Sequence, residues 1–207
     1  GKEVSLMQIA EEACQAEIGI LKSPIGKQDQ YAAAFGGINF YEFMKDGRVR
    51  VEALWNRVTD LQELFDSGTL YWTGVQRRAE DVLGEQQKNI PSQIEALKKM
   101  TGLAKSCRLS FLNSENLVGD IASIVNQGWA YKRNYASTVS SSTLEDGIAR
   151  AIAAGAHGAK IAGAGGGGFL YVLASDRDKE SVTKALSPMS PVSFKYCQFG
   201  SKVLTAI

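Results

Sequence analysis

The chain has 207 residues, of which 44% are hydrophobic and 22% are charged, and these proportions are typical of a globular protein with a sizeable core. Its 23 basic and 22 acidic residues leave a net charge of +1, which excludes the strong positive field that proteins use to attract nucleic acids or anionic membranes. No apolar run reaches the roughly 18 residues of a transmembrane helix, so no membrane partner is expected.

The cysteine and histidine content indicates the cellular compartment and limits the kinds of metal site that the protein can form. Cys14, Cys107 and Cys197 are scattered and lack C-x-x-C spacing, so they are interpreted as reduced core residues of a cytoplasmic protein. The single histidine, His157, excludes a histidine-rich metal site and is assigned to a loop or a helix end. The sequence begins Gly-Lys-Glu-Val-Ser, with neither an initiator methionine nor a signal-peptide pattern, and we expect it to be part of a larger protein.

The first segment predicts an amphipathic helix. Apolar residues recur at helical spacing over residues 4–20, and Ser5 is the expected N-cap. Glu17 lies near the end of this helix, where a solvated surface charge is the ordinary interpretation of a glutamate.

A second helix is predicted over residues 27–35, after a break at residues 23–26. Gly36-Gly37 is its expected C-cap, and Asp29 falls in its first turn. An acidic residue at that place interacts favourably with the helix dipole, so Asp29 by itself is more often a structural residue of the helix start than a catalytic one.

The middle of the chain continues with short elements and then long helices. Residues 38–44 and 48–54 predict a β-hairpin across Lys45-Asp46-Gly47, and a short helix follows up to Gly68. Residues 70–73 predict a buried strand. A basic helix containing Arg77 and Arg78 is expected next, and residues 86–136 are predicted to be helical throughout, with Pro91 near one helix start.

An aromatic and basic cluster ends this helical region. It contains Trp129, Tyr131, Lys132, Arg133 and Tyr135. Two interpretations stay open: aromatic core residues with cations that extend to the surface, or a binding site for an anion.

The last third begins with a predicted capping box at Ser142 and Glu145, which starts a helix through residue 154. Strands are expected at residues 169–174, 192–196 and 202–206, with a helix at 176–186. This order of elements is that of a split βαβ layer.

The most unusual stretch is Gly163-Ala164-Gly165-Gly166-Gly167-Gly168. Glycine costs about 0.5–1 kcal/mol against alanine in ordered structure, so this run favours backbone that approaches a ligand, most often a phosphate. A glycine-rich turn between two strands is the alternative. The stretch also matches G-x-G-x-x-G, but a strand-like sequence follows where a dinucleotide site requires a helix, so that assignment fails.

Two segments together resemble the GHMP small-molecule kinases. Residues 24–37 resemble the aspartate helix of that family, and residues 160–169 resemble its C-terminal glycine-rich motif. Residues 70–79 and 129–133 resemble the sugar-phosphate branch, the D-glycero-D-manno-heptose 7-phosphate kinases. The resemblance implies an α+β fold: residues 1–66 complete a ribosomal-protein-S5-like N-terminal domain, and residues 67–207 form a ferredoxin-like C-terminal domain with added helices.

The resemblance also implies roles for individual residues. Asp29 would orient or deprotonate the acceptor hydroxyl, with Lys27 as a charge partner, and Glu17 would help to hold Mg²⁺. Residues 163–168 would close over ATP phosphates and the sugar. The substrate phosphate would be bound by Arg77, Lys132 and Arg133.

The implied activity is ATP-dependent phosphorylation of a small-molecule sugar phosphate, by a cytoplasmic monomer or homodimer. The family's first motif and its phosphate-binding second motif do not occur in this sequence, so the chain alone is expected to be inactive. Another GHMP sugar kinase, of the fucose or galactose type, and a non-catalytic ligand-binding protein of the same fold stay open. The presence of both Glu17 and Asp29 favours an enzyme.

Overall fold

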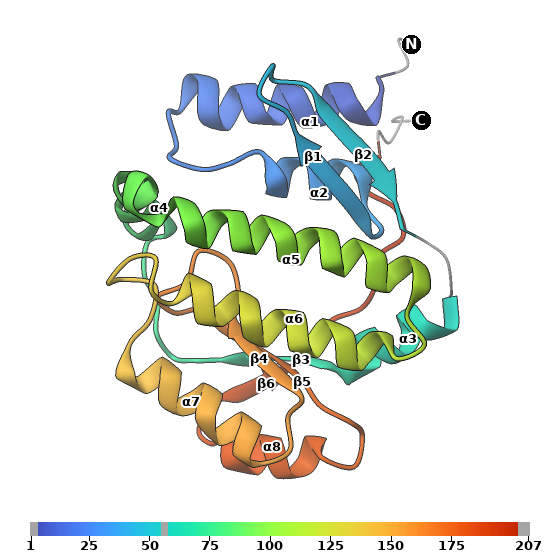
Figure 1. Ribbon diagram of the computed structural model, residues 1–207, viewed down its shortest axis with the longest axis vertical. Coiled ribbons are helices and arrows are strands. Elements are labelled where there is room, and N and C mark those ends of the chain that lie inside the picture. The colour runs from blue at the N-terminus through green and yellow to red at the C-terminus, as the bar shows by residue number, and fades with distance from the viewer. Residues whose placement is uncertain (1–3, 55–57, 203–207) are drawn as a thin grey trace, which may run out of the picture. The chain divides into compact units, whose positions relative to one another are not determined.

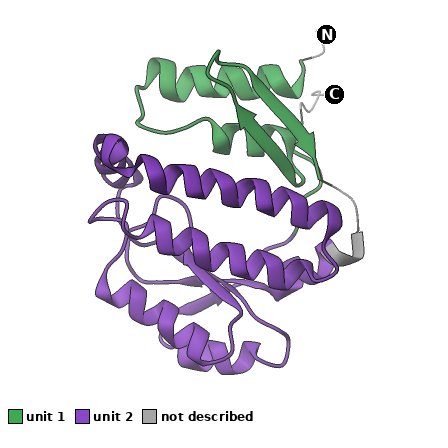
Figure 2. Ribbon diagram, in the orientation of Figure 1, with its two compact units in different colours: residues 1–56, 196–207 green, residues 57–195 purple. Residues whose placement is uncertain are grey.

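The computed structural model describes residues 4–54 and 58–202. The chain forms two compact units, one of residues 1–56 with 196–207 and the other of residues 57–195 (Figure 2). We call them unit 1 and unit 2. The predicted domain division after residue 66 stays a prediction about the domains of the whole protein.

Unit 1 contains two helices and a β-hairpin. Helix α1 (Leu6–Cys14) begins at Ser5, whose hydroxyl accepts a hydrogen bond from the Gln8 N–H, as the sequence predicts. The helix continues as the π-helix η1 (Gln15–Ile20), and α2 (Gln28–Phe35) follows. Strands β1 (Asn39–Phe43) and β2 (Val49–Ala53) pair in antiparallel fashion, so the predicted hairpin is confirmed.

The core of unit 1 lies between α1, α2 and the hairpin. Tyr31 and Ala34 of α2 pack against Ala10 and Cys14 of α1, and all four are buried. The segment after residue 195 adds to the end of α2, where the Ser201 N–H donates to the Ala33 carbonyl at 3.0 Å. The described residues end at residue 202, so the remainder of the strand predicted at 202–206 lies outside them.

Unit 2 is built on a four-stranded antiparallel sheet within the described residues. Its strands are β3 (Gly68–Trp72), β4 (Gly158–Ile161), β5 (Phe169–Leu173) and β6 (Ser190–Val192), in the order β4-β5-β3-β6. Each neighbouring pair is antiparallel, and this order confirms the predicted split βαβ arrangement. The strand predicted at 192–196 is observed earlier, at β6, because its pairing partner is the end of β3.

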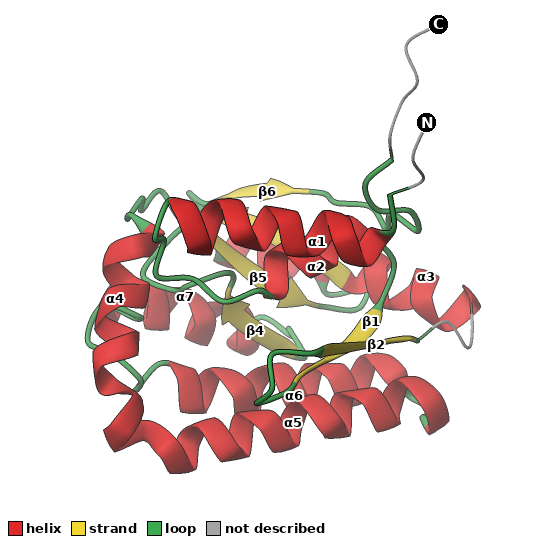
Figure 3. Cartoon of the chain, turned by 90° about the horizontal axis from the view of Figure 1, so that it is seen from above, coloured by secondary structure: helices red, strands yellow, loops and turns green. Residues whose placement is uncertain are grey.

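Helices cover both faces of this sheet (Figure 1). Leu170 and Val172 of β5 face a core shared with α7 (Ser142–Ala153) and α8 (Lys179–Ala185). Leu173 belongs to a second core, which contains residues of α3 (Val58–Ser67), α5 (Ile94–Asn113) and α6 (Leu117–Lys132). Helices α5 and α6 run side by side (Figure 1, Figure 3). None of the described helices has the length and apolar character needed to cross a membrane.

Several boundaries differ from the sequence predictions. The helical region predicted over residues 86–136, with a helix start near Pro91, is observed as separate elements: α4 (Ala79–Asn89) and the 3-10 turn η2 (Ile90–Gln93) precede α5, and α6 begins after a break at which the Asn116 side chain accepts from the Gly119 N–H. Arg77 lies before α4 rather than in it. Among the cysteines, all free, Cys14 is buried but Cys197 is exposed and is not a core residue.

Helix α7 begins one residue earlier than predicted. Its N-cap is Ser141, whose hydroxyl accepts from the Leu144 N–H. The Glu145 carboxylate does not complete a capping box, because it instead accepts hydrogen bonds from Trp129 and Ser140 and pairs with Arg133 at 3.1 Å. Other side-chain partners, between five and sixteen residues away in the chain, therefore replace the local cap.

Candidate active site

The glycine loop, residues 163–168, connects β4 to β5 at one end of the sheet of unit 2. All five of its glycines have positive φ, between 65° at Gly163 and 154° at Gly167. A residue with a Cβ rarely adopts this backbone conformation, so the local conformation explains the glycine content.

The second half of the glycine loop is packed into the protein. The Gly166 N–H donates to the Val139 carbonyl at 2.6 Å, and the Gly168 N–H donates to the Val75 carbonyl at 2.8 Å. A Cβ at Gly166 would lie 2.6 Å from the Thr138 carbonyl oxygen, and one at Gly167 would lie 2.6 Å from that of Val75. These two glycines are therefore required for close packing of the loop.

The first half of the glycine loop is open. Gly163 is exposed, and a Cβ there would meet no atom within 4 Å. Within the described residues, no acceptor pairs with the backbone N–H groups of Gly163, Ala164 and Gly165. A loop with unpaired N–H groups is the backbone arrangement that binds anions, phosphates above all.

Side chains from two helices hold the carbonyl groups of this open half. The Lys132 ammonium donates to the Gly163 carbonyl, and the Gln86 amide donates to the Ala164 carbonyl at 2.9 Å. The sequence predicts a site role for Lys132 but does not indicate Gln86. No local signal marks Gln86, because its partner is 78 residues away in the chain.

Two of the three predicted phosphate ligands lie beside the loop. The Arg77 side chain passes over Gly166, with its Cδ atom 3.3 Å from the position of an added Cβ. Arg77 is exposed and makes no ion pair with any residue that the structure describes. Lys132 contacts the loop directly, whereas Arg133 is held by Glu145.

Glu85 holds a neighbouring segment of the chain against which the glycine loop packs. Its carboxylate accepts hydrogen bonds from the backbone N–H and the hydroxyl of both Ser137 and Thr138. The Thr138 hydroxyl and then the Ser137 hydroxyl contribute most to lowering the pKa of Glu85 to about 2. The segment that Glu85 holds continues to Val139, the acceptor for Gly166.

The predicted acidic residues belong to unit 1. Asp29 is exposed in the first turn of α2, and no side chain in the described ranges pairs with its carboxylate. Glu17 lies half-buried in η1, where the Ser23 N–H bonds to its backbone carbonyl. Lys27 forms an ion pair with Glu11 at 3.5 Å, and Glu11 also accepts a hydrogen bond from the buried Tyr31.

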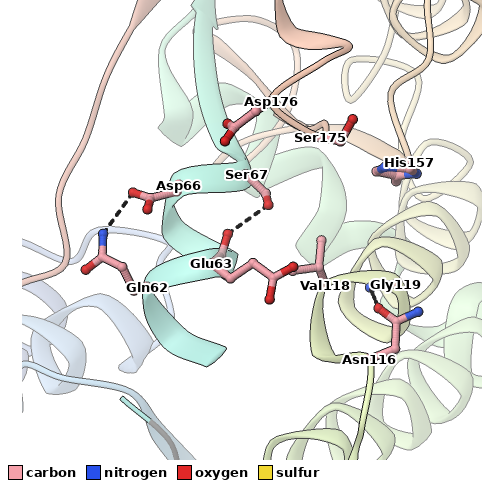
Figure 4. Close-up of a pocket in the computed structure, with 10 residues that line it drawn as sticks. All are labelled: Gln62, Glu63, Asp66, Ser67, Asn116, Val118, Gly119, His157, Ser175 and Asp176. Atoms are coloured by element: carbon pink, nitrogen blue, oxygen red, sulfur yellow. Dashed lines mark hydrogen bonds between the residues drawn. The ribbon is translucent and has the colours of Figure 1, made fainter. Parts of the chain in front are cut away.

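A cavity of about 600 Å³ opens at the opposite end of the sheet of unit 2 (Figure 4). Its polar groups are largely bound to near neighbours: Gln62 to Asp66 at 2.9 Å, and the Ser67 hydroxyl to the Glu63 carbonyl at 2.7 Å. His157, a loop residue as predicted, also lines it. No three histidine, cysteine or acidic side chains of residues 4–54 and 58–202 come together as a metal site. The glycine loop is therefore the stronger candidate site.

Comparison with known proteins decides the family. Residues 114–189, which include the glycine loop, match the family described as GHMP kinases C terminal. The chain contains a GHMP kinase C-terminal domain. The chain is also 31% identical, over 89% of its length, to the D-glycero-alpha-D-manno-heptose 7-phosphate kinase of Campylobacter jejuni, and it spans 53% of that protein.

Further proteins are similar to this GHMP kinase domain in structure or in sequence. A D-glycero-D-manno-heptose 1-phosphate kinase of Bacteroides thetaiotaomicron superposes with a TM-score of 0.71 and 27% identity, over 99% of this chain and 57% of that one. The bifunctional fucokinase/GDP-fucose pyrophosphorylase of Arabidopsis thaliana is 30% identical over 74% of this chain and 15% of its own length. The chain thus spans about half the length of the heptose kinase relatives, and the predicted α+β GHMP fold is confirmed.

Proposed function

We propose that the protein is an ATP-dependent GHMP sugar kinase, and that its acceptor is the anomeric hydroxyl of D-glycero-D-manno-heptose 7-phosphate. The identity of the chain to a heptose 7-phosphate kinase supports this substrate class. The observation that carries the proposal is the open half of the glycine loop. Its N–H groups have no acceptor among residues 4–54 and 58–202, and Arg77 and Lys132 contact the same loop. Backbone donors and fixed cations together are the groups that phosphoryl transfer requires.

The acid–base part of the reaction belongs to unit 1 in this proposal. Asp29 would accept the proton of the sugar hydroxyl. The oxygen of that hydroxyl would attack the terminal phosphate of ATP, and ADP would leave. An exposed carboxylate that has no side-chain partner in the described part of the chain can contact a substrate in this way. Lys27, which pairs with Glu11, would serve as a charge partner at the start of α2.

In this proposal, the carboxylate of Glu17 would be the protein ligand of a magnesium ion of the kind that kinases use. Mg²⁺ typically takes one or two protein carboxylates and completes its shell with phosphate oxygens and water, so Glu17 would suffice as the protein ligand. Bound Mg²⁺ neutralises charge on the ATP phosphates. Gly163, Ala164 and Gly165 would donate to phosphate oxygens through their N–H groups.

The substrate phosphate would be bound by Arg77 and Lys132, with Arg133 as a further predicted ligand. A charge-assisted hydrogen bond contributes about 1.5–3 kcal/mol, so loss of one should raise KM by about one to two decades. Arg78 provides a matched control, because it is the next residue and is also exposed but is paired with Glu80.

The test compares Arg77→Ala and Arg78→Ala in the full-length protein, using heptose 7-phosphate and unphosphorylated hexoses as acceptors. We expect Arg77→Ala to raise KM only for the phosphorylated sugar, and Arg78→Ala to change KM for neither. Equal turnover of both sugars by the unsubstituted enzyme would instead favour a fucose- or galactose-type kinase. Absence of any ATP-dependent turnover would favour the non-catalytic binding protein.

A further inference from the structure

Two neighbouring peptide groups of the glycine loop are fixed by side chains. The carbonyl of Gly163 accepts from Lys132, and the carbonyl of Ala164 accepts from Gln86 at 2.9 Å. The two donors come from different helices, since Lys132 ends α6 and Gln86 lies in the last half of α4. The orientation of this backbone therefore depends on tertiary contacts.

Peptide geometry then sets the direction of the N–H groups. In a planar trans peptide, the carbonyl of one residue and the N–H of the next point in opposite directions. The Ala164 N–H must therefore point away from Lys132, and the Gly165 N–H must point away from Gln86. Both N–H groups lack an acceptor within the described residues, so they are available to a group outside the protein.

The side chain of Ala164 supplies a further constraint. It packs against the core cluster that contains Val139 and Ile161, so the residue between the two fixed carbonyls cannot rotate freely. The N–H of the following peptide is not available to a ligand, because the Gly166 N–H is bound to the Val139 carbonyl. The loop thus presents two adjacent N–H donors, at Ala164 and Gly165. Along the chain, the Gly163 carbonyl that Lys132 binds precedes them, and the packed backbone of Gly166 follows them.

We propose that Gln86 is a positioning residue, which holds the Ala164 and Gly165 N–H groups toward a phosphate group of the bound substrates. The inference rests on the proposed function for the identity of the ligand. Gln86 touches no substrate in this proposal; it acts through the Ala164 carbonyl alone. Because its amide is neutral, its contribution is orientational, whereas Lys132 adds charge as well.

The size of the effect follows from one neutral hydrogen bond. Such a bond contributes about 0.5–1.5 kcal/mol net, which corresponds to a weakening of anion binding by about two- to tenfold when Gln86 is replaced by a residue without a donor. Gln86→Met keeps the length of the side chain and removes the donor. Gln86→Lys restores a donor, and Gln87→Ala changes the neighbouring exposed residue of the same helix.

The test is a titration of the ¹⁵N-labelled 207-residue chain with inorganic pyrophosphate, followed at the backbone amides of Ala164 and Gly165. In the unsubstituted chain both resonances should shift saturably. In Gln86→Met both should differ from the unsubstituted chain before ligand is added, and the Kd should rise about two- to tenfold. Gln86→Lys should recover much of the affinity, and Gln87→Ala should match the unsubstituted chain.

Two results would overturn the inference. One is wild-type affinity and unshifted Ala164 and Gly165 resonances in Gln86→Met, with Gln86→Ala as a second donor-free variant if the methionine variant melts early. The other is the absence of a saturable shift at these amides in the unsubstituted chain. Neither depends on turnover, so failure of the kinase proposal is recognised separately in the acceptor assay with Arg77→Ala.

Discussion

The packing of the glycine loop predicts that two of its glycines differ sharply in what they tolerate. Gly163 and Gly166 have similar positive φ values, 65° and 77°. A Cβ at Gly163 would meet nothing within 4 Å, whereas at Gly166 it would lie 2.6 Å from the Thr138 carbonyl oxygen and 3.2 Å from Val82 Cγ2. Gly163→Ala and Gly166→Ala are therefore a matched pair for the effect of packing.

The conformational cost is common to both variants. An L-residue in the left-handed region costs about 1–2 kcal/mol, and this applies at each position. Gly166→Ala adds overpacking against backbone that Glu85 holds in place, which costs a further 1–3 kcal/mol or so. At about 2–4 °C per kcal/mol for a chain of this size, Gly166→Ala should melt roughly 2–12 °C below Gly163→Ala.

The assay is thermal unfolding by far-UV circular dichroism, with pyrophosphate binding measured on both variants below the melting transition. We expect Gly163→Ala to lose stability only through the conformational cost that both variants share, and to bind pyrophosphate more weakly because its N–H is in the open half of the loop. Equal melting temperatures for the two variants would refute the packing argument. At Gly166 and Gly167, the contacts that an added Cβ would make with backbone carbonyl groups make loss of stability the main expected effect of substitution.

Two other predictions concern carboxylates. Asp29→Asn in the full-length protein should lower kcat by about 10²-fold or more with an almost unchanged melting temperature, because the side chain is exposed and asparagine is tolerated at a helix start; near wild-type kcat would leave Asp29 a purely structural role. Glu85 has a pKa of about 2, below its ordinary 4.5, so its hydrogen bonds add stability above pH 4.5 and lose it as pH falls toward 2. Glu85→Gln should therefore reduce the melting temperature at pH 7 but by progressively less at pH 4 and pH 3, and a reduction independent of pH would contradict this assignment.

Local features of this protein were readable from the sequence. Ser5 caps α1, Gly36 ends α2 with positive φ, and the turn at residues 45–47 joins β1 to β2. Each of these depends on hydrogen bonds or backbone conformations within about four residues, where side-chain type and spacing decide the outcome. The order of the sheet elements was also predictable, because apolar strands and amphipathic helices alternate in the chain.

Only the tertiary structure decided how the candidate site is held. Gln86 and Glu85 are ordinary helix-surface residues in the sequence, and their partners lie 78 and 52–53 residues away. Glu145 likewise does not form its predicted local cap, and it instead binds Trp129, Ser140 and Arg133. A polar side chain has several partners of similar strength, and which one it binds depends on which backbone groups folding brings near it. The glycine run therefore indicated that a close approach occurs, while tertiary packing determined that Gly165, Gly166 and Gly167 approach the protein itself and that the Ala164 and Gly165 N–H groups have no acceptor among the described residues.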